Sequence, residues 1–277
     1  MNERSLWRRF AASRSGVLGL VILVIVGLVA LTAPIFFPEN PFAIVDKPFL
    51  PPFGKYLLGT DSLGRDLAGG IAHGARTSLM IGLLATAATL IVGTITGALA
   101  GFYGGRIDNA LMRFTELFQT IPPFIFAIVL VAILSPSLRS TVIAIAVVSW
   151  PPIARLVRGE FLTLRNREFV QACVVLGMGD MQMIWRQILP NCLSPIIVTG
   201  SLLVATAILT ESALAFLGLG DTNVMSWGFM IGAGRTYLRS AWWLCAIPGI
   251  AILLTVLAIN LVGEGLNDAL NPRLRSH

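Results

Sequence analysis

Long stretches of the chain carry no charged side chain, and short segments rich in charge separate them. The first stretch runs from Val17 to Phe37, after a leader with four arginines. Four more lie between Arg76 and Arg106, Glu116 and Arg139, Arg186 and Glu211, and Arg239 and Glu264. A helix needs about 20 apolar residues to cross roughly 30 Å of hydrocarbon, and each stretch can supply them. The pattern therefore predicts five transmembrane helices.

A sixth helix is predicted between Arg139 and Arg155, where fifteen uncharged residues include Pro151 and Pro152. This window is short, so its terminal arginines must extend their side chains toward the membrane surfaces. The first window has the basic-then-apolar order of a secretory signal peptide, but it is long for one and no A-x-A-like site follows it. We expect an all-α integral membrane protein with about six transmembrane helices.

Basic residues are unevenly divided between the two sides of these six spans. One side holds thirteen of the twenty Lys and Arg residues: Arg4, Arg8, Arg9, Arg14, Arg106, Arg113, Arg155, Arg158, Arg165, Arg167, Arg186, Arg273 and Arg275. Because basic residues concentrate in cytoplasmic segments, we expect the N- and C-termini to be cytoplasmic. The net charge of +6 follows from this bias. No basic face with stacking aromatics lies outside the spans, so nucleic-acid binding is not expected.

Composition agrees with a membrane protein that has no substantial water-soluble domain. Hydrophobic residues make up 56% of the chain and charged residues only 12%, whereas soluble domains are about a quarter charged. The three cysteines are an odd number, and Cys173 and Cys192 fall in a predicted cytoplasmic loop, so no structural disulfide is expected. With His73 and His277 as the only histidines, we expect no metal site in the protein.

Two enzymatic interpretations have little support. Residues 177–180 read Gly-Met-Gly-Asp, the G-x-G-D string of intramembrane aspartyl proteases, but no second aspartate lies in another span. Lys47 and Lys55 are the only lysines and neither belongs to a P-loop, so another chain must bind any ATP that drives this protein. Glu211 is the main acid deep inside a span, which argues against a proton relay and leaves open a structural or a functional role.

The chain divides into three parts. Residues 1–76 hold the cytoplasmic leader, the first transmembrane helix and a periplasmic strap whose prolines exclude regular helix. Near the end of this strap, Thr60 or Asp61 could cap a short helix that starts at Leu63. Residues 77–270 form the transmembrane core, with a cytoplasmic loop at 158–191, and residues 271–277 form a cytoplasmic tail.

The second span carries a ridge of small residues at intervals of four. They are Ala85, Thr89, Gly93, Gly97, Gly101 and Gly105. Such ridges let two helix backbones approach closely inside a membrane. The pattern predicts a packing face and leaves open whether the partner helix belongs to this chain or to another.

The cytoplasmic loop is too long for a simple turn. Residues 166–176 predict a short amphipathic helix that Gly177 and Gly179 stop, and residues 181–189 predict a second amphipathic stretch. Such helices can lie on the lipid surface or offer a docking surface to a partner.

Within this loop, Gln171-Ala172-Cys173, Gly177 and Ile188-Leu-Pro190 resemble the EAA loop of ABC-importer permeases. Gln171 and Cys173 depart from the usual Glu and Ala, while Glu168 supplies an acid one helical turn earlier. Further strings resemble the dipeptide, oligopeptide and nickel branch of that family, in its second-permease (C-type) form. They are residues 59–66 (Gly59, Thr60, Asp61, Gly64, Arg65 and Asp66 among them), 74–79, 216–220, 226–228 and 260–273.

The resemblance implies a type I importer permease fold and a subunit that forms half of a pore. Its expected partners are a homologous second permease, two cytoplasmic ATPases that bind ATP and Mg²⁺, and a periplasmic binding protein. The loop would dock one ATPase through Glu168, Phe169, Gln171, Ala172, Gly177 and Asp180, with Pro190 ending the loop where the fifth span begins. No cofactor in the chain and no covalent chemistry are expected.

Peptides are the expected cargo, and nickel or a metal–chelator complex is the alternative. A stand-alone secondary carrier is a second alternative, which predicts transport by this chain alone, driven by an ion gradient.

Overall fold

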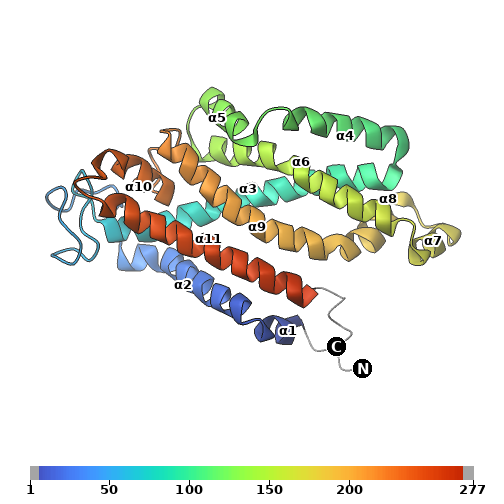
Figure 1. Cartoon of the computed structure of the whole chain (residues 1–277), viewed down its shortest axis with the longest axis horizontal. Coiled ribbons are helices and arrows are strands. Elements are labelled where there is room, and N and C mark those ends of the chain that lie inside the picture. The colour runs from blue at the N-terminus through green and yellow to red at the C-terminus, as the bar shows by residue number, and fades with distance from the viewer. Residues whose placement is uncertain (1–5, 271–277) are drawn as a thin grey trace.

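The computed structural model describes residues 6–270, and these residues form an all-helical protein (Figure 1). The helices are α1 (Leu6–Ala12), α2 (Arg14–Phe36), α3 (Leu67–Tyr103), α4 (Gly105–Gln119), α5 (Pro123–Leu134), α6 (Leu138–Leu164), α7 (Glu168–Val175), α8 (Asp180–Gln182), α9 (Leu189–Phe216), α10 (Trp227–Gly234) and α11 (Trp243–Leu270). A π-helical turn, Met183–Ile188, joins α8 to α9, and a 3-10 turn, Arg235–Tyr237, follows α10. The described range excludes the first five residues of the leader and the expected tail at 271–277, which contains the end of the 260–273 string.

The expectation of about six spans is confirmed, with one difference in shape. Five helical runs are long and apolar enough to cross a membrane: α2, α3, α6, α11 and the continuous run from Asp180 to Phe216. The third predicted span is instead a bent pair, α4 and α5, with an angle of 81° between them. Pro122 and Pro123 stand at the bend, and Pro disfavours the helical conformation in the residue before it and lacks an N–H.

The fourth span, which the sequence predicts from the shortest window, is the 27-residue helix α6. It continues through Pro151 and Pro152 and beyond the arginine that closes the charge-free window. One charge on this extension is compensated, because Asp108 of α4 accepts two hydrogen bonds from the Arg158 guanidinium, one of them 2.6 Å long. The charge-free window therefore underestimates the length of α6, because the tertiary ion pair with Asp108 offsets the free-energy cost of placing the Arg158 charge in the helix.

Helix α3 begins at Leu67, so the expected division at residue 76 falls inside it. The predicted cap at Thr60 or Asp61 is wrong: the Asp66 carboxylate accepts hydrogen bonds from the backbone N–H groups of Ala68 and Gly69. No separate short helix lies between α2 and α3, because the cap lies six residues downstream of Thr60 and opens the span itself.

The small-residue ridge of α3 packs against α6 of the same chain, which answers the question that the sequence left open. A Cβ on Gly93 would lie 2.7 Å from the Ile153 side chain, and one on Gly101 would lie 2.6 Å from Phe161 Cβ. On Gly97 it would lie 2.4 Å from a backbone carbonyl oxygen of α6. The ridge ends at Gly101, because Gly105 has a φ of +54° and starts α4.

The two ends of the helical bundle carry different elements. Helix α1, helix α7 and the C-terminal end of α11 lie at one end, and the 37–66 strap and α10 lie at the other (Figure 1). Helices α3 and α6 run in the same direction, opposite to α2 and α9 (Figure 1). This arrangement is what six spans with both chain ends on one side require.

Candidate functional site

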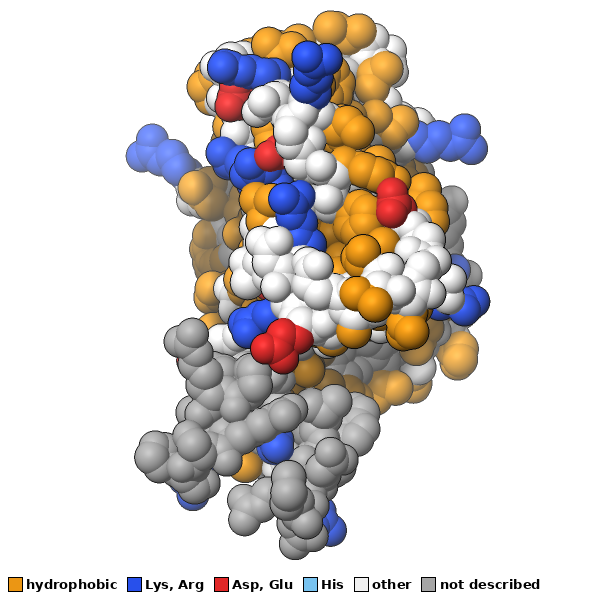
Figure 2. All heavy atoms as spheres, turned by 90° about the vertical axis from the view of Figure 1, so that its right-hand side faces the viewer, with side chains coloured by type: hydrophobic (Ala, Val, Ile, Leu, Met, Phe, Trp, Pro, Cys, Tyr) orange, Lys and Arg blue, Asp and Glu red, His pale blue; other side chains and the backbone are white. Residues whose placement is uncertain are grey.

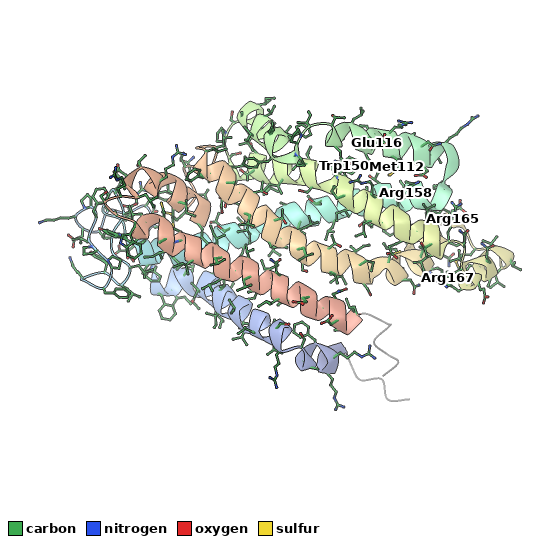
Figure 3. All side chains as sticks on the ribbon, in the orientation of Figure 1. Met112, Glu116, Trp150, Arg158, Arg165 and Arg167 are labelled. Carbon is green, nitrogen blue, oxygen red and sulfur yellow. The ribbon has the colours of Figure 1, made fainter. Side chains whose placement is uncertain are left out.

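The connecting segment, defined here as residues 165–188, is tied to the ends of α3 and α6. Val170 of α7 is 2% exposed and packs into a cluster with Phe161 of α6 and Ile184 and Ile188 of the π-helical turn. Arg165 Nη1 donates hydrogen bonds to two carbonyl oxygens at the end of α3, 3.1 and 3.3 Å away. Figure 3 shows Arg165 at the end of α6 that adjoins α7. Helix α7 is therefore firmly seated on the bundle.

The C-terminus of α7 is closed by a Schellman motif with Gly177 at its turning point. The Gly177 N–H donates to Val174 O and the Met178 N–H donates to Cys173 O, both at 3.0 Å. Gly177 has a φ of +73°, a conformation that favours glycine. The predicted stop at this residue is confirmed. Gly179 instead has a φ of −69° and a ψ of 150°, which any residue can adopt.

Large apolar side chains of the connecting segment are exposed at the end of the molecule. We call this the apolar patch: Phe169, Val174, Val175, Leu176, Met181 and Trp185. Val175 is 87% exposed and Leu176 82%. Hydrophobic and basic side chains lie close together on the face seen in Figure 2, which is this end of the molecule. An apolar cluster next to charged groups is typical of a protein–protein contact.

The other predicted docking residues lie around this patch. Glu168 is the first residue of α7, and Asp180 is the first of α8, so both carboxylates stand at helix N-termini, where negative charge is favoured. Gln171 and Ala172 are exposed on α7, and Gln171 Nε2 donates to Arg165 O at 3.3 Å. The structure thus brings these residues to one surface.

Pro190 does not separate the loop from the fifth span. The helical run is continuous from Asp180 to Phe216, and Pro190 lies one residue inside α9. The predicted amphipathic stretch at 181–189 is therefore the first part of the spanning helix. A π-helical turn that ends at Ile188, two residues before Pro190, changes the hydrogen-bond register, which accommodates a residue without an N–H.

At the opposite end of the molecule, the 59–66 string folds the strap upon itself. Thr60 is fully buried, and its Oγ1 accepts from the Leu50 N–H at 2.9 Å and donates to Lys47 O at 2.7 Å. Gly59 and Gly64 have φ values of +83° and +79°. A Cβ at either position would also lie 2.3 Å or less from a carbonyl oxygen of the strap.

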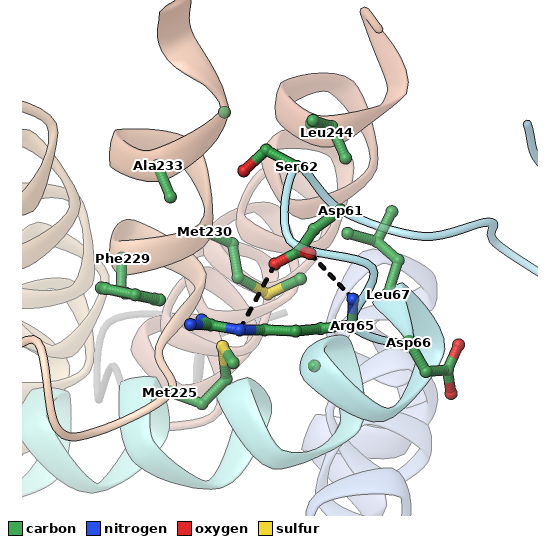
Figure 4. Close-up of a pocket in the computed structure, with 12 residues that line it drawn as sticks. Asp61, Ser62, Arg65, Asp66, Leu67, Met225, Phe229, Met230, Ala233 and Leu244 are labelled. Atoms are coloured by element: carbon green, nitrogen blue, oxygen red, sulfur yellow. Dashed lines mark hydrogen bonds and ion pairs between the residues drawn. The ribbon is translucent and has the colours of Figure 1, made fainter. Parts of the chain in front are cut away.

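The charged residues of the same string have structural partners as well. Asp61 Oδ1 accepts from the N–H groups of Leu63 and Arg65 at 2.8 and 2.9 Å. The Arg65 guanidinium lies 3.9 Å from Asp61 Oδ2 and over the Phe42 ring, 4.9 Å from its centre. Figure 4 shows the Arg65 side chain next to Asp61 and to two methionines, Met225 and Met230. The string therefore determines the shape of the strap.

Glu211 joins α9 to the start of α10. Its side chain is buried, and its carboxylate accepts hydrogen bonds from Ser226 Oγ at 2.7 Å and Ser212 Oγ at 3.4 Å. Ser226 also caps α10 by accepting from the Phe229 N–H. The contacts favour the interpretation of Glu211 as a satisfied structural acid. Among residues 6–270, no three His, Cys, Asp or Glu side chains are grouped closely enough to hold a metal ion.

The Asp108–Arg158 pair is an interaction that the sequence does not predict. The two residues are 50 positions apart, and nothing in the local pattern of either segment connects them. The pair attaches α4 to α6 close to the connecting segment, as the position of Arg158 in Figure 3 shows.

Comparisons with known proteins cover nearly the whole chain. Residues 93–276 match the family described as "Binding-protein-dependent transport system inner membrane component" and residues 4–52 match the "N-terminal TM domain of oligopeptide transport permease C". The di/tripeptide transport system permease protein of Pseudomonas aeruginosa (strain UCBPP-PA14) is 41% identical, over 99% of this chain and 93% of that protein. The oligopeptide transport system permease protein of Bacillus subtilis (strain 168) is 37% identical, over 98% of this chain and 91% of that protein.

A solved structure has the same fold. A chain of the MetNI methionine ABC transporter, in inward-facing conformations, aligns with a TM-score of 0.59 over 70% of this chain and 93% of that chain. The identity is 17%, so this likeness concerns the arrangement of helices alone.

Proposed function

Because the chain belongs to the family of binding-protein-dependent transport system inner membrane components, we propose that it forms half of the pore of an ATP-driven importer of di- and oligopeptides. Membership makes it a multi-pass transport component of the inner membrane and not the ATPase, and it implies an ATPase and a binding protein as partners. The peptide cargo rests on relatives named for dipeptide, di/tripeptide and oligopeptide transport that match nearly the full chain.

The finer assembly is part of this proposal. A homologous second permease completes the pore, two ATPases bind ATP and Mg²⁺ on the cytoplasmic side, and a periplasmic protein delivers the peptide. The apolar patch supports the docking of one ATPase on α7, because side chains as exposed as Val175 and Leu176 need a partner to cover them in water. Glu168, Phe169, Gln171, Ala172, Gly177 and Asp180 keep the docking role that the loop pattern predicts.

Coupling follows from the way α7 is held. ATP-driven closure of the ATPases moves α7, and α7 cannot move independently of the bundle because Val170 is buried against α6 and the π-helical turn. The hydrogen bonds of Arg165 extend this attachment to α3. Movement of the docked helix therefore becomes a rigid rotation of the spans, which opens the pore to alternate sides.

The proposal is tested by reconstituting the chain with its second permease and ATPases in proteoliposomes and adding peptide-loaded binding protein. We expect ATP-dependent peptide uptake, and we expect Leu176→Ala to weaken retention of the ATPase and lower uptake. Leu31→Ala is the matched control, because Leu31 is 76% exposed on the lipid-facing helix α2. Equal effects of the two substitutions would contradict docking at the patch.

The same preparation separates the alternatives. Uptake by this chain alone, driven by an ion gradient and indifferent to ATP, would support a secondary carrier. ATP-dependent uptake of a nickel–chelator complex with no uptake of peptide would retain the importer and contradict the peptide assignment.

A further inference from the structure

From Pro152 onward, the exposed residues of helix α6 form one narrow stripe that contains no large apolar side chain. The stripe consists of Pro152, Arg155, Gly159 and Thr163, spaced by three, four and four residues and therefore on one helix face. A Cβ on Gly159 would meet no atom within 4 Å, so the stripe faces open space.

The exposed faces of the other spans are different. On α2 the exposed side chains include Val21, Val24 and Leu28, and on α11 they include Leu253 and Leu257. Such faces suit a lipid environment. A stripe of proline, arginine, glycine and threonine gains nothing from contact with lipid tails, and an arginine placed there is costly. The composition of the α6 stripe therefore suits water better than lipid, and inside a transport bundle water is found along the path of the substrate.

Arg155 is the charged member of this stripe and differs from its neighbours on the helix. Arg158 is paired with Asp108, and Arg165 donates to two carbonyl oxygens. Arg155 makes no hydrogen bond or ion pair with any described side chain or backbone group. In the sequence of α6 it falls between Trp150 and Arg158, the two residues of this helix segment that Figure 3 labels. At 1.5 Å per residue it is about 13 Å from the end of α6 at Leu164, inside the span.

We propose that this stripe lines the cytoplasmic half of the translocation path and that Arg155 binds the carboxylate of the passing peptide. A guanidinium presents a planar, permanently charged fork that matches an oxyanion. A carboxylate is the one charged acceptor that every free peptide carries. The assignment of the ligand rests on the proposed peptide function, whereas the assignment of the stripe to the aqueous path does not. A lipid phosphate offers Arg155 the same oxyanion chemistry.

The first experiment tests the stripe without any peptide. Cys173, Cys192 and Cys245 are replaced by alanine, and R155C or G159C is introduced into the complete transporter in inverted membrane vesicles. A charged, membrane-impermeant thiol reagent should modify both at least tenfold faster than V24C. Val24 is 51% exposed on α2 and about 15 Å from Arg14, a similar depth on a lipid-facing stripe. Slow modification of both stripe cysteines, equal to that of V24C, would overturn the path assignment.

The second experiment tests the ligand. During turnover with saturating peptide-loaded binding protein, modification of G159C should slow at least threefold. This protection should disappear in G159C/R155Q and persist in G159C/R155K, a difference that a purely structural role of Arg155 would not produce. Unaltered protection in G159C/R155Q would overturn the binding role.

Vesicles of neutral lipid alone separate the two oxyanions. Protection that still depends on Arg155 there supports the peptide carboxylate, whereas dependence on Arg155 only in anionic lipid assigns it to a phosphate headgroup and overturns the carboxylate. A wild-type transporter that imports no peptide would contradict the proposed function, and the first experiment would still decide whether the stripe is aqueous.

Discussion

Gly177 and Gly179 stand two residues apart, but the backbone requires glycine at only one of them. Gly177 has a φ of +73°, and no atom lies within 4 Å of where a Cβ would be placed at either residue. Gly177→Ala should therefore act through backbone strain alone, at a cost of about 1 kcal/mol in the stability of the α7 terminus. We expect it to reduce the stimulation of ATPase activity by peptide-loaded binding protein.

Two further variants serve as controls for this prediction. Gly179→Ala should leave stimulation unchanged, because its backbone is extended. Gly177→Asn should recover part of the loss, because asparagine tolerates the left-handed conformation better than alanine. If Gly179→Ala reduces the stimulation of ATPase activity as much as Gly177→Ala, coupling does not depend on the Schellman motif at the end of α7.

Thr60 is the residue on which the conformation of the strap depends most. Thr60→Val keeps the shape of the side chain but removes the hydroxyl, leaving the Leu50 N–H and Lys47 carbonyl without this partner. We expect a loss of about 1–3 kcal/mol in the stability of the strap, measured as faster cleavage by a protease added to spheroplasts. Ser62→Ala, which removes a neighbouring hydroxyl with no hydrogen bond in the described chain, should cleave at the wild-type rate.

At the scale of elements, the packing of α3 on α6 depends on the absence of side chains. Gly97→Ala places a methyl group 2.4 Å from the Ala154 carbonyl oxygen, so the two helices must separate. Overpacking of this kind costs about 1–3 kcal/mol and should lower the thermal unfolding temperature in detergent. Gly27→Ala on α2 is the control, since a Cβ there meets nothing within 4 Å. Equal unfolding temperatures for the two variants would show that α3 and α6 can separate with no loss of stability.

Helix α4 is bounded by Gly104 and Gly105 at one end and by the proline bend at the other, so its position depends on tertiary contacts. Asp108→Asn removes the charge that pairs with Arg158, and we expect faster amide hydrogen exchange across 105–119. Asn109→Ala changes the exposed neighbour and should not alter exchange. Unchanged exchange in Asp108→Asn would mean that the aromatic contacts of Phe114 and Phe118 with Trp150 hold α4 by themselves.

At the scale of the whole molecule, the orientation in the membrane can be tested through two residues. Lys47 and Lys55 are the only lysines, and both lie in the strap. An impermeant amine reagent added to spheroplasts should modify both, because the strap is predicted to be periplasmic. Lys47→Arg/Lys55→Arg should abolish this labelling. Labelling of the lysines in sealed inverted vesicles, but not in spheroplasts, would reverse the orientation.

The two lysines should react at different rates. Asp46 accepts a hydrogen bond from Lys55, which raises the pKa of the Lys55 ammonium and lowers the pKa of the Asp46 carboxyl. A raised pKa leaves less free amine at a given pH, so Lys55 should react more slowly than Lys47. Asp46→Asn should lower the pKa of Lys55 and speed its reaction, while Lys47 serves as the internal reference. If Lys55 still reacts more slowly than Lys47 in Asp46→Asn, the hydrogen bond to Asp46 is not the cause of the difference.

Features that depend on neighbouring residues were predictable. Hydropathy located the spans, Gly177 marked the end of α7, and the prolines of the strap excluded helix, because burial in lipid and local turn chemistry act on consecutive residues. The exposure of Leu176 was not predictable in this way, since an amphipathic pattern does not say which face a partner covers.

Features that join distant residues required the tertiary structure. By itself, the sequence determined an all-helical membrane protein with about six spans, and it predicted a loop that resembles the EAA loop. Tertiary structure alone decided that Asp66 caps α3, that the third span bends, and that the glycine ridge packs on α6 of the same chain. It also showed that Arg158 is paired and Arg155 is free, because each of these outcomes depends on contacts across the bundle that local pattern does not encode.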